Sequence, residues 1–199
     1  MNGLSDEDKK IPINLNINTV REVTTNESRG VTVALKSLKE SIMKLPTKKI
    51  RILTDWIIKR ELLLENESTF RPDGLKKYRQ KEIILVDFGF NVDGEFGGRH
   101  YAVVLEKNNN PKSSVILVAP ITSYDPANGE TVHPTNVDLG IGAINNYEKG
   151  AAVVVNQIRN ISKMRIEKPK TSAEEKSYIS QDKFEELLKK IKAKISIDI

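Results

Sequence analysis

The sequence contains no cysteine among its 199 residues. This absence excludes disulfide bonds, thiol nucleophiles and thiolate metal sites, and it fits a reducing compartment. The chain also has no apolar run long enough to cross a membrane, and Lys9 and Lys10 lead into no apolar stretch of the kind that a secretion signal carries. We therefore expect a cytoplasmic protein that makes no contact with a membrane.

Positive charge is unevenly distributed along the chain. Residues 1–80 carry 16 Lys and Arg against 11 Asp and Glu, whereas residues 81–199 carry 16 against 16. The whole net charge of +5 therefore belongs to the N-terminal part. A basic segment beside a neutral domain attracts polyanions, but an excess of this size is equally typical of a well-solvated helical surface.

The N-terminal part is predicted to consist of a mobile polar tail and a helical hairpin. Residues 1–29 are polar and without periodicity, although residues 11–17 alternate in the manner of an edge strand. Apolar residues at helical spacing predict helices over 31–45 and 48–66, because a proline separates the two patterns. We expect a helical extension over residues 30–78, which needs another surface on which to pack.

After Gln80 the sequence changes to a β pattern. Short apolar segments separated by polar loops, with no helices between them, predict a compact antiparallel barrel. The predicted strands span residues 81–88, 101–106, 114–121, 131–138, 151–158 and 160–166. A final helix follows Ser180, with acidic residues first and lysines last, as the helix dipole prefers. Its apolar stripe comprises Phe184, Leu187, Leu188, Ile191 and Ile195. The sequence thus predicts an α+β domain over residues 79–199.

The most informative segment is a glycine-containing loop that leads into an apolar strand. The run from Glu95 to Leu105 brings a guanidinium and an imidazole, those of Arg99 and His100, to the start of that strand. Two later strand ends add a hydroxyl, an amide and a second guanidinium, which belong to Thr122, Gln157 and Arg159. Such a set of groups suits chemistry on a phosphodiester.

Cutting RNA without a metal ion requires three functions. The ribose 2′-hydroxyl loses a proton as it attacks the phosphorus, the leaving 5′-oxygen gains a proton, and charge on the phosphate oxygens is stabilised. Histidine suits proton transfer because its unperturbed pKa is about 6.5. Arginine suits the phosphate because its planar fork donates two hydrogen bonds at once. Hydroxyl and amide groups donate to phosphate oxygens or base edges.

Five pieces of this region occur in an order and spacing typical of one protein family. They are Ile84-Leu85-Val86-Asp87-Phe88; Gly94-Glu95-Phe96-Gly97-Gly98 with Tyr101-Ala102-Val103-Val104-Leu105; Pro120-Ile121-Thr122-Ser123; Pro134-Thr135-Asn136-Val137-Asp138-Leu139; and Gln157-Ile158-Arg159-Asn160-Ile161 with Arg165. Through these pieces, residues 81 to about 166 resemble the MazF/PemK toxins of bacterial toxin–antitoxin pairs. The resemblance implies an SH3-like barrel with a C-terminal helix, preceded here by the helical extension.

The resemblance also implies an activity and partners. It implies a metal-independent endoribonuclease that cuts single-stranded RNA, such as mRNA, and needs no cofactor. The products would carry a 5′-hydroxyl and a 2′,3′-cyclic phosphate or a 3′-phosphate. It further implies a homodimer and a cognate antitoxin protein that occupies the RNA groove, with DNA contacted only through the antitoxin.

The chain departs from the family pattern at one important place. Family members read Gly, a variable residue, Arg and Pro before the apolar strand, and that arginine is the main catalytic residue. Here His100 holds the arginine position, Tyr101 holds the proline position, and Arg99 falls one place early. Because neighbours on a strand point to opposite faces, Arg99 replaces the arginine only if the loop shifts by one residue. We expect catalysis through His100, Arg99 or both, with Thr122 as the matched catalytic threonine.

RNA is expected to lie across this loop and the neighbouring strand ends. The predicted RNA-binding residues are Gly97, Gly98, Tyr101, Ser123, Gln157 and Arg159. Since Gln157 and Arg159 are two residues apart, we predict that they share one strand face.

Two other functions fit the same sequence. In the first, a barrel that has lost its arginine binds RNA or a partner protein without cutting. In the second, residues 1–80 occlude the groove as a built-in inhibitor, so that their deletion raises cleavage.

Overall fold

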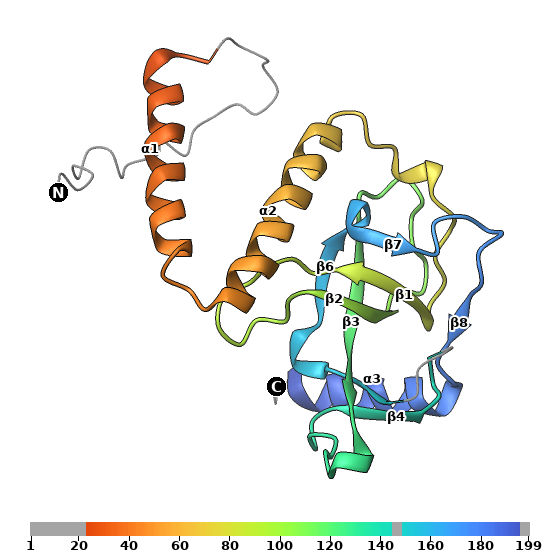
Figure 1. The fold of residues 1–199 in the computed structure, drawn as a ribbon. Helices are drawn as coiled ribbons and strands as arrows, with labels where there is room; N and C mark the ends of the chain where they lie inside the picture. Colours follow the sequence, from red (N-terminus) through yellow and green to blue (C-terminus); the bar gives the residue numbers. More distant parts are fainter. Residues whose placement is uncertain (1–22, 145–148, 196–199) are drawn as a thin grey trace. The chain divides into compact units, whose positions relative to one another are not determined.

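The computed structural model describes residues 23–144 and 149–195 (Figure 1). The chain forms two compact units, Met1–Asp55 and Trp56–Ile199. The edge strand predicted over residues 11–17 lies outside the described residues. Among the described residues, no helix combines the length and the apolar character that crossing a membrane requires.

The described part of the first unit is helical. Helix α1 (Thr25–Ile42) begins six residues before its predicted start, inside the stretch predicted as a tail. Thr24 and Glu27 explain this early start, because they form a capping box that satisfies the first backbone N–H groups. Helix α2 (Thr47–Glu67) follows, and its first half belongs to this unit. Neither helix has a buried residue, so their apolar stripes are not enclosed within the described residues.

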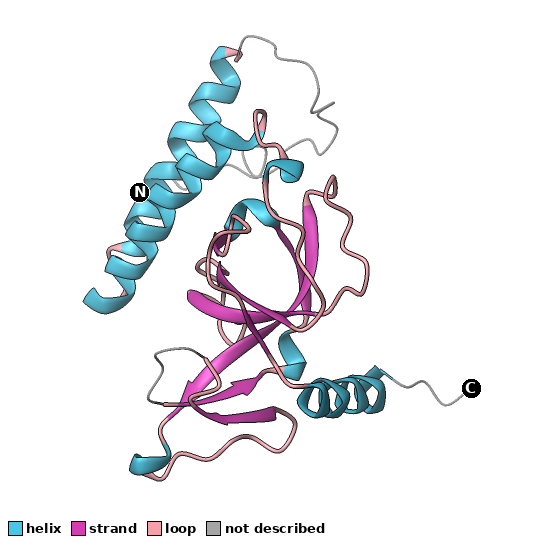
Figure 2. Cartoon of the chain, turned by 90° about the vertical axis from the view of Figure 1, so that its right-hand side faces the viewer, coloured by secondary structure: helices cyan, strands magenta, loops and turns pink. Residues whose placement is uncertain are grey.

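The second unit contains the end of α2, a strongly curled sheet and a C-terminal helix (Figure 2). Its strands are β1 (Glu82–Asp87), β2 (Arg99–Val104), β3 (Val115–Tyr124), β4 (Val137–Ile141), β5 (Gly150–Val153), β6 (Arg159–Ser162), β7 (Ile166–Lys168) and β8 (Ser177–Tyr178). Short 3₁₀ turns are η1 (Pro72–Gly74), η2 (Pro126–Asn128), η3 (Val155–Gln157) and η4 (Lys163–Arg165), and the last helix is α3 (Gln181–Ile195).

All strand pairings in the sheet are antiparallel. The pairing path runs β4-β5-β3-β2-β1-β7, with β6 also paired to β3 and β8 to β1. Strand β3 is long enough to pair with β6 through its first half and with β5 through its second. The predicted α+β class with an antiparallel sheet is confirmed, although β4 and β7 do not pair, so the sheet among the described strands remains open.

Three predicted strands are wrong in their bounds. The strand predicted over residues 131–138 begins only at Val137, because His133 and Pro134 open a turn that the backbone N–H of Asn136 closes on the carbonyl of His133, at 2.8 Å. The strand predicted over residues 151–158 ends at Val153, and η3 follows it. The strand predicted over residues 160–166 is divided by η4, which separates β6 from β7. Residues 131–136, 155–157 and 163–165 are therefore connections rather than strand.

The sheet separates two apolar clusters, and β2 contributes to both. Val103 packs in a cluster that α3 covers with Phe184 and Leu187. Ala102 and Val104 pack in the other cluster, which contains Phe88 and is joined at its edge by Phe96. Because strand side chains alternate between faces, odd and even residues of β2 point to different clusters. This alternation decides the direction of the side chains at the start of β2.

Helix α3 covers its cluster with only part of the predicted stripe. Phe184 and Leu187 are buried, and Ile191 packs at the edge of the cluster. Leu188 and Ile195 remain exposed. The helix is therefore anchored mainly by its first two turns.

Candidate functional site

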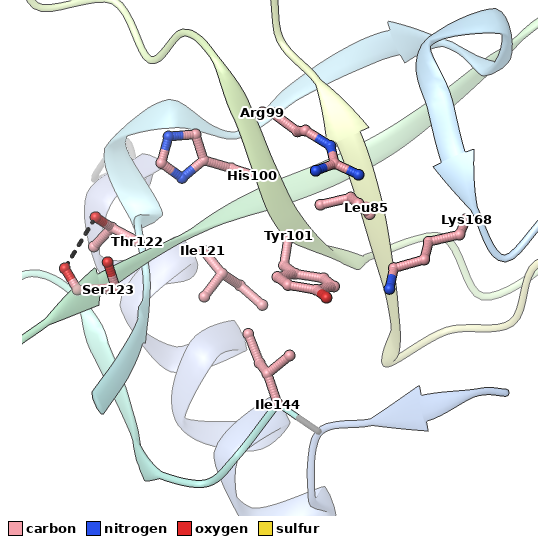
Figure 3. Close-up of a pocket in the computed structure, with 9 residues that line it drawn as sticks. All are labelled: Leu85, Arg99, His100, Tyr101, Ile121, Thr122, Ser123, Ile144 and Lys168. Carbon is pink, nitrogen blue, oxygen red and sulfur yellow. Dashed lines mark hydrogen bonds between the residues drawn. The ribbon is translucent and has the colours of Figure 1, made fainter. Parts of the chain in front are cut away.

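The starts and ends of three strands meet around one pocket of about 220 Å³ (Figure 3). It is lined by Leu85, Arg99, His100, Tyr101, Ile121, Thr122, Ser123, Ile144 and Lys168. The three predicted catalytic residues are all in this lining, together with two of the predicted RNA-binding residues. The fold thus brings together groups that lie far apart in the sequence.

His100 and Thr122 share one face of the sheet. The pairing of β2 with β3 ends at Ala102 and Pro120, and His100 and Thr122 each lie two residues beyond these partners. Figure 3 shows both side chains on the same side of the strands, whereas Arg99 leaves β2 in the opposite direction. The Thr122 hydroxyl makes only a long hydrogen bond, of 3.4 Å, to the carbonyl of Ser123. A hydroxyl and an imidazole therefore face each other at the pocket.

The imidazole of His100 is partly enclosed by an aromatic neighbour. Its ring centroid lies 4.5 Å from that of Phe96, which in turn packs edge-on against Phe88. Burial lowers the pKa of His100 below its ordinary value of 6.5, although a hydrogen bond with the backbone of Ile121 opposes the shift. At neutral pH the ring is therefore mainly uncharged and able to accept a proton.

Arg99 belongs to a chain of four alternating charges. Its Nε donates to Glu167, whose carboxylate also pairs with Lys59 at 2.5 Å. Lys59 lies 2.6 Å from Asp87, the residue that pairs with Arg99 in the β1–β2 register. Burial alone would raise the pKa of Glu167, but the hydrogen bonds and charges of Lys59 and Arg99 lower it. Glu167 is thus held ionised between two cations.

Gln157 and Arg159 hold the loop that precedes the site. The amide of Gln157 accepts from the N–H of Phe96 at 3.2 Å and donates to the carbonyl of Gly94 at 3.1 Å. Arg159 donates to the carbonyl of Phe96, and its guanidinium lies 5.2 Å from the Phe88 ring centroid. They do not share a strand face as predicted, since Gln157 ends η3 and Arg159 begins β6. Both side chains nevertheless converge on the same loop.

The predicted glycines of the loop meet a backbone requirement. Gly98 has φ +82°, a conformation that side chains with a Cβ rarely adopt, and its N–H donates to the carbonyl of Gly89 at 2.7 Å. A Cβ on Gly97 would lie 2.7 Å from the same carbonyl oxygen. The two glycines therefore let the loop close directly before Arg99.

Sequence reasoning missed several residues around the pocket. Lys168 lies with its Nζ 5.9 Å from the Tyr101 ring centroid and lines both this pocket and a second one of about 240 Å³ beside it. Lys59 and Glu167 were also missed. A lysine on an amphipathic helix and a glutamate among lysines give no sign in the sequence that they form an ion pair. Only the fold shows that they meet.

Comparison with known proteins gives one family. The chain matches the family described as PemK-like, MazF-like toxins of type II toxin–antitoxin systems over residues 79–195. No curated protein matches the chain.

Solved structures of similar fold share little sequence with the chain. MazF from Deinococcus radiodurans is 18% identical, with 61% of this chain and 99% of that chain covered and a TM-score of 0.47. The toxin MazF-mt6 from Mycobacterium tuberculosis is 16% identical, with coverages of 59% and 99% and a TM-score of 0.41. An endoribonuclease in complex with its cognate antitoxin, from a mycobacterial species, is 10% identical, with coverages of 58% and 90% and a TM-score of 0.38.

Proposed function

Because the chain belongs to the family of PemK-like, MazF-like toxins of type II toxin–antitoxin systems, we propose that it is an endoribonuclease that cuts single-stranded RNA without a metal ion. The observation that carries the proposal is that His100, Thr122 and Arg99 line one pocket. A proton acceptor, a hydroxyl donor and a guanidinium at one strand end are the groups that phosphodiester transfer needs.

In the proposed reaction, His100 acts as the base. The neutral imidazole takes the proton of the ribose 2′-hydroxyl as the 2′-oxygen bonds to phosphorus. The bond from phosphorus to the 5′-oxygen breaks, and water in the open pocket protonates the leaving oxygen. The hydroxide that remains takes the proton back from His100. The products are a 2′,3′-cyclic phosphate and a 5′-hydroxyl, and the side chain returns to its starting state.

Thr122 and Arg99 have a different task in this proposal. The Thr122 hydroxyl donates to a phosphate oxygen, since its one hydrogen bond within the described residues, to the carbonyl of Ser123, is long and exposed. The guanidinium of Arg99 uses Nε for Glu167, which leaves its two terminal amino groups for the phosphate. Charge that develops on the phosphate oxygens is then stabilised by a hydroxyl and a guanidinium that line the same pocket.

The remaining contacts proposed for RNA surround this centre. Tyr101 offers an aromatic face for a base, and Ser123 a hydroxyl at the exposed end of β3. Gly97, Gly98, Gln157 and Arg159 act on RNA through the shape of the loop that they build. We further propose that the protein forms a homodimer and that a cognate antitoxin covers the RNA site.

The proposed activity is tested by incubating the purified protein with an mRNA in excess EDTA and mapping the product ends. Cleavage with 5′-hydroxyl ends is expected, and His100→Ala should lower the rate by about 100-fold or more, since a general base typically contributes that much. His133→Ala is the matched control, because His133 is exposed and bonds to Thr135 at 2.8 Å in a turn.

Two outcomes would contradict the proposal. Cleavage that appears only after a divalent metal is added would remove the metal-independent mechanism. Tight RNA binding with no product at long incubation would favour an RNA-binding module. In such a module, catalysis has been lost because the arginine usual in the family is absent.

A further inference from the structure

Helix α2 contributes a charged side chain to the proposed RNA site, although it lies outside the residues that match the family. Lys59, on the part of α2 within the second unit, has its Nζ 2.6 Å from Asp87 and 2.5 Å from Glu167. Glu167 in turn binds Arg99. A residue twenty positions before the family match is therefore two contacts away from a guanidinium that lines the pocket.

The part of α2 in the second unit packs through its tryptophan on the loop after β1 and on η4. The Trp56 ring lies so close to Gly89 that a Cβ there would come within 2.6 Å of it, and the guanidinium of Arg165 lies 5.1 Å from the ring centroid. Because Trp56 is three residues before Lys59, the two side chains lie on the same face of the helix. This packing gives Lys59 a defined position. An ion pair needs such a fixed geometry if it is to affect function.

The four charges are balanced. Asp87 and Glu167 carry two negative charges, and Lys59 and Arg99 carry two positive charges. Asp87 and Glu167 are 13% and 24% exposed, so their charges are less screened than those of a fully exposed pair. Without Lys59 these four positions would be left with one net negative charge, and Glu167 would keep Arg99 as its ion-pair partner while Arg165 acts on Asp87.

We infer that Lys59 is a positioning residue of the RNA site: it holds Glu167 and Asp87 so that Arg99 remains available to the phosphate of the substrate. The inference rests on the proposed function, since it assumes that Arg99 contacts RNA. It makes the end of α2 a part of the RNA site. This role differs from two others that the N-terminal part could have, namely attracting RNA by its net charge and covering the site.

The test compares variants of the full chain on a single-stranded RNA that the wild type cuts. Lys59→Met should raise KM by about tenfold, a size typical of coupled charges within one network, with a smaller effect on kcat. Lys59→Arg keeps the charge and should retain the wild-type KM within about threefold. Lys49→Met, an exposed lysine earlier on α2, is the matched control and should leave KM unchanged.

A second variant separates positioning from a purely structural role. Glu167→Gln on its own should lower KM, since the group then carries one net positive charge. Adding Glu167→Gln to Lys59→Met removes the uncompensated carboxylate and should restore KM to within about threefold of wild type. A lysine needed only for folding would instead lower the melting temperature, measured by circular dichroism, and the second substitution would not restore KM.

The outcomes distinguish this inference from the proposed function. If the wild type cuts RNA and Lys59→Met has an unchanged KM, or the double variant is no better than the single one, the inference is overturned while the nuclease stands. If the wild type cuts no RNA, the proposed function fails first, and the role of Lys59 in it fails as well.

Discussion

Arg99 and His100 are neighbours in the chain but belong to different surroundings. His100 shares its face with Phe96 and Thr122, whereas Arg99 points the other way and binds Glu167. The sequence could predict that these two residues reach the site, because the motif before the strand is specific. It could not predict that His100 contacts Phe96 or that Arg99 binds Glu167. The path of the loop brings Phe96 to His100, and β7 brings Glu167 to Arg99. Figure 3 shows that His100, and not Arg99, lies on the same side of the strands as Thr122.

The environment of His100 predicts a pH dependence. Burial lowers its pKa below 6.5, so the neutral form that accepts a proton is already dominant at pH values where an exposed histidine would be charged. We expect kcat/KM to rise with pH through this lowered pKa, so that the midpoint of the rise lies below about pH 6.5. The pKa can be measured by NMR, because the chain has only two histidines.

The control for this prediction is Phe96→Ala. Removing the ring exposes His100 to water, so its pKa should rise towards 6.5 and the acidic limb of the rate profile should move with it. A rate profile that does not follow the measured pKa of His100 would show that another group acts as the base.

The loop before β2 depends on η3 and β6, which follow it by about sixty residues. Gln157 and Arg159 supply three hydrogen bonds to its backbone. The sequence indicated the strands of this domain well, because apolar alternation is a local signal. It failed at residues 131–136, 155–157 and 163–165, where a turn and two 3₁₀ segments stand in place of predicted strand. It also missed the start of α1, although Thr24 and Glu27 were available as a capping signal.

The role of Arg159 in this loop can be measured. Arg159→Met keeps the aliphatic length but loses the bond to Phe96 and the contact with Phe88, so we expect the free energy of unfolding to fall by about 1–3 kcal/mol. Because the loop carries Arg99 and His100, kcat/KM should fall as well. Denaturant titration and a cleavage assay check both. Arg71→Met is an exposed control, and weaker RNA binding with unchanged stability would instead indicate a direct contact of Arg159 with RNA.

The two compact units divide the chain within α2, between Asp55 and Trp56. The basic excess of the N-terminal part lies mostly after residue 45, because residues 1–45 carry seven Lys and Arg against six Asp and Glu. Composition alone showed that residues 1–80 are basic. It could not show that the end of α2 packs on the loop after β1, since that contact depends on Trp56 and Gly89 meeting across the fold.

This division predicts the effect of a truncation. A chain that starts at residue 46 keeps Trp56 and Lys59 and loses only one net positive charge. We expect its RNA cleavage rate and its dependence on salt to stay within about twofold of the full chain. The rates are compared at two salt concentrations, after circular dichroism has confirmed folding. A rise of tenfold or more would support the built-in inhibitor, in which the removed residues cover the site.

The position of Trp56 makes its fluorescence a probe of this part of the fold. It is the only tryptophan in the chain, and its indole lies against Gly89 and beside Arg165, next to the loop that leads to the pocket. Excitation near 295 nm therefore addresses this one position, and the emission spectrum reports the polarity around it. A red shift would signal that the helix end has left the sheet, so a stopped-flow fluorometer could time that movement against substrate cutting without any added dye.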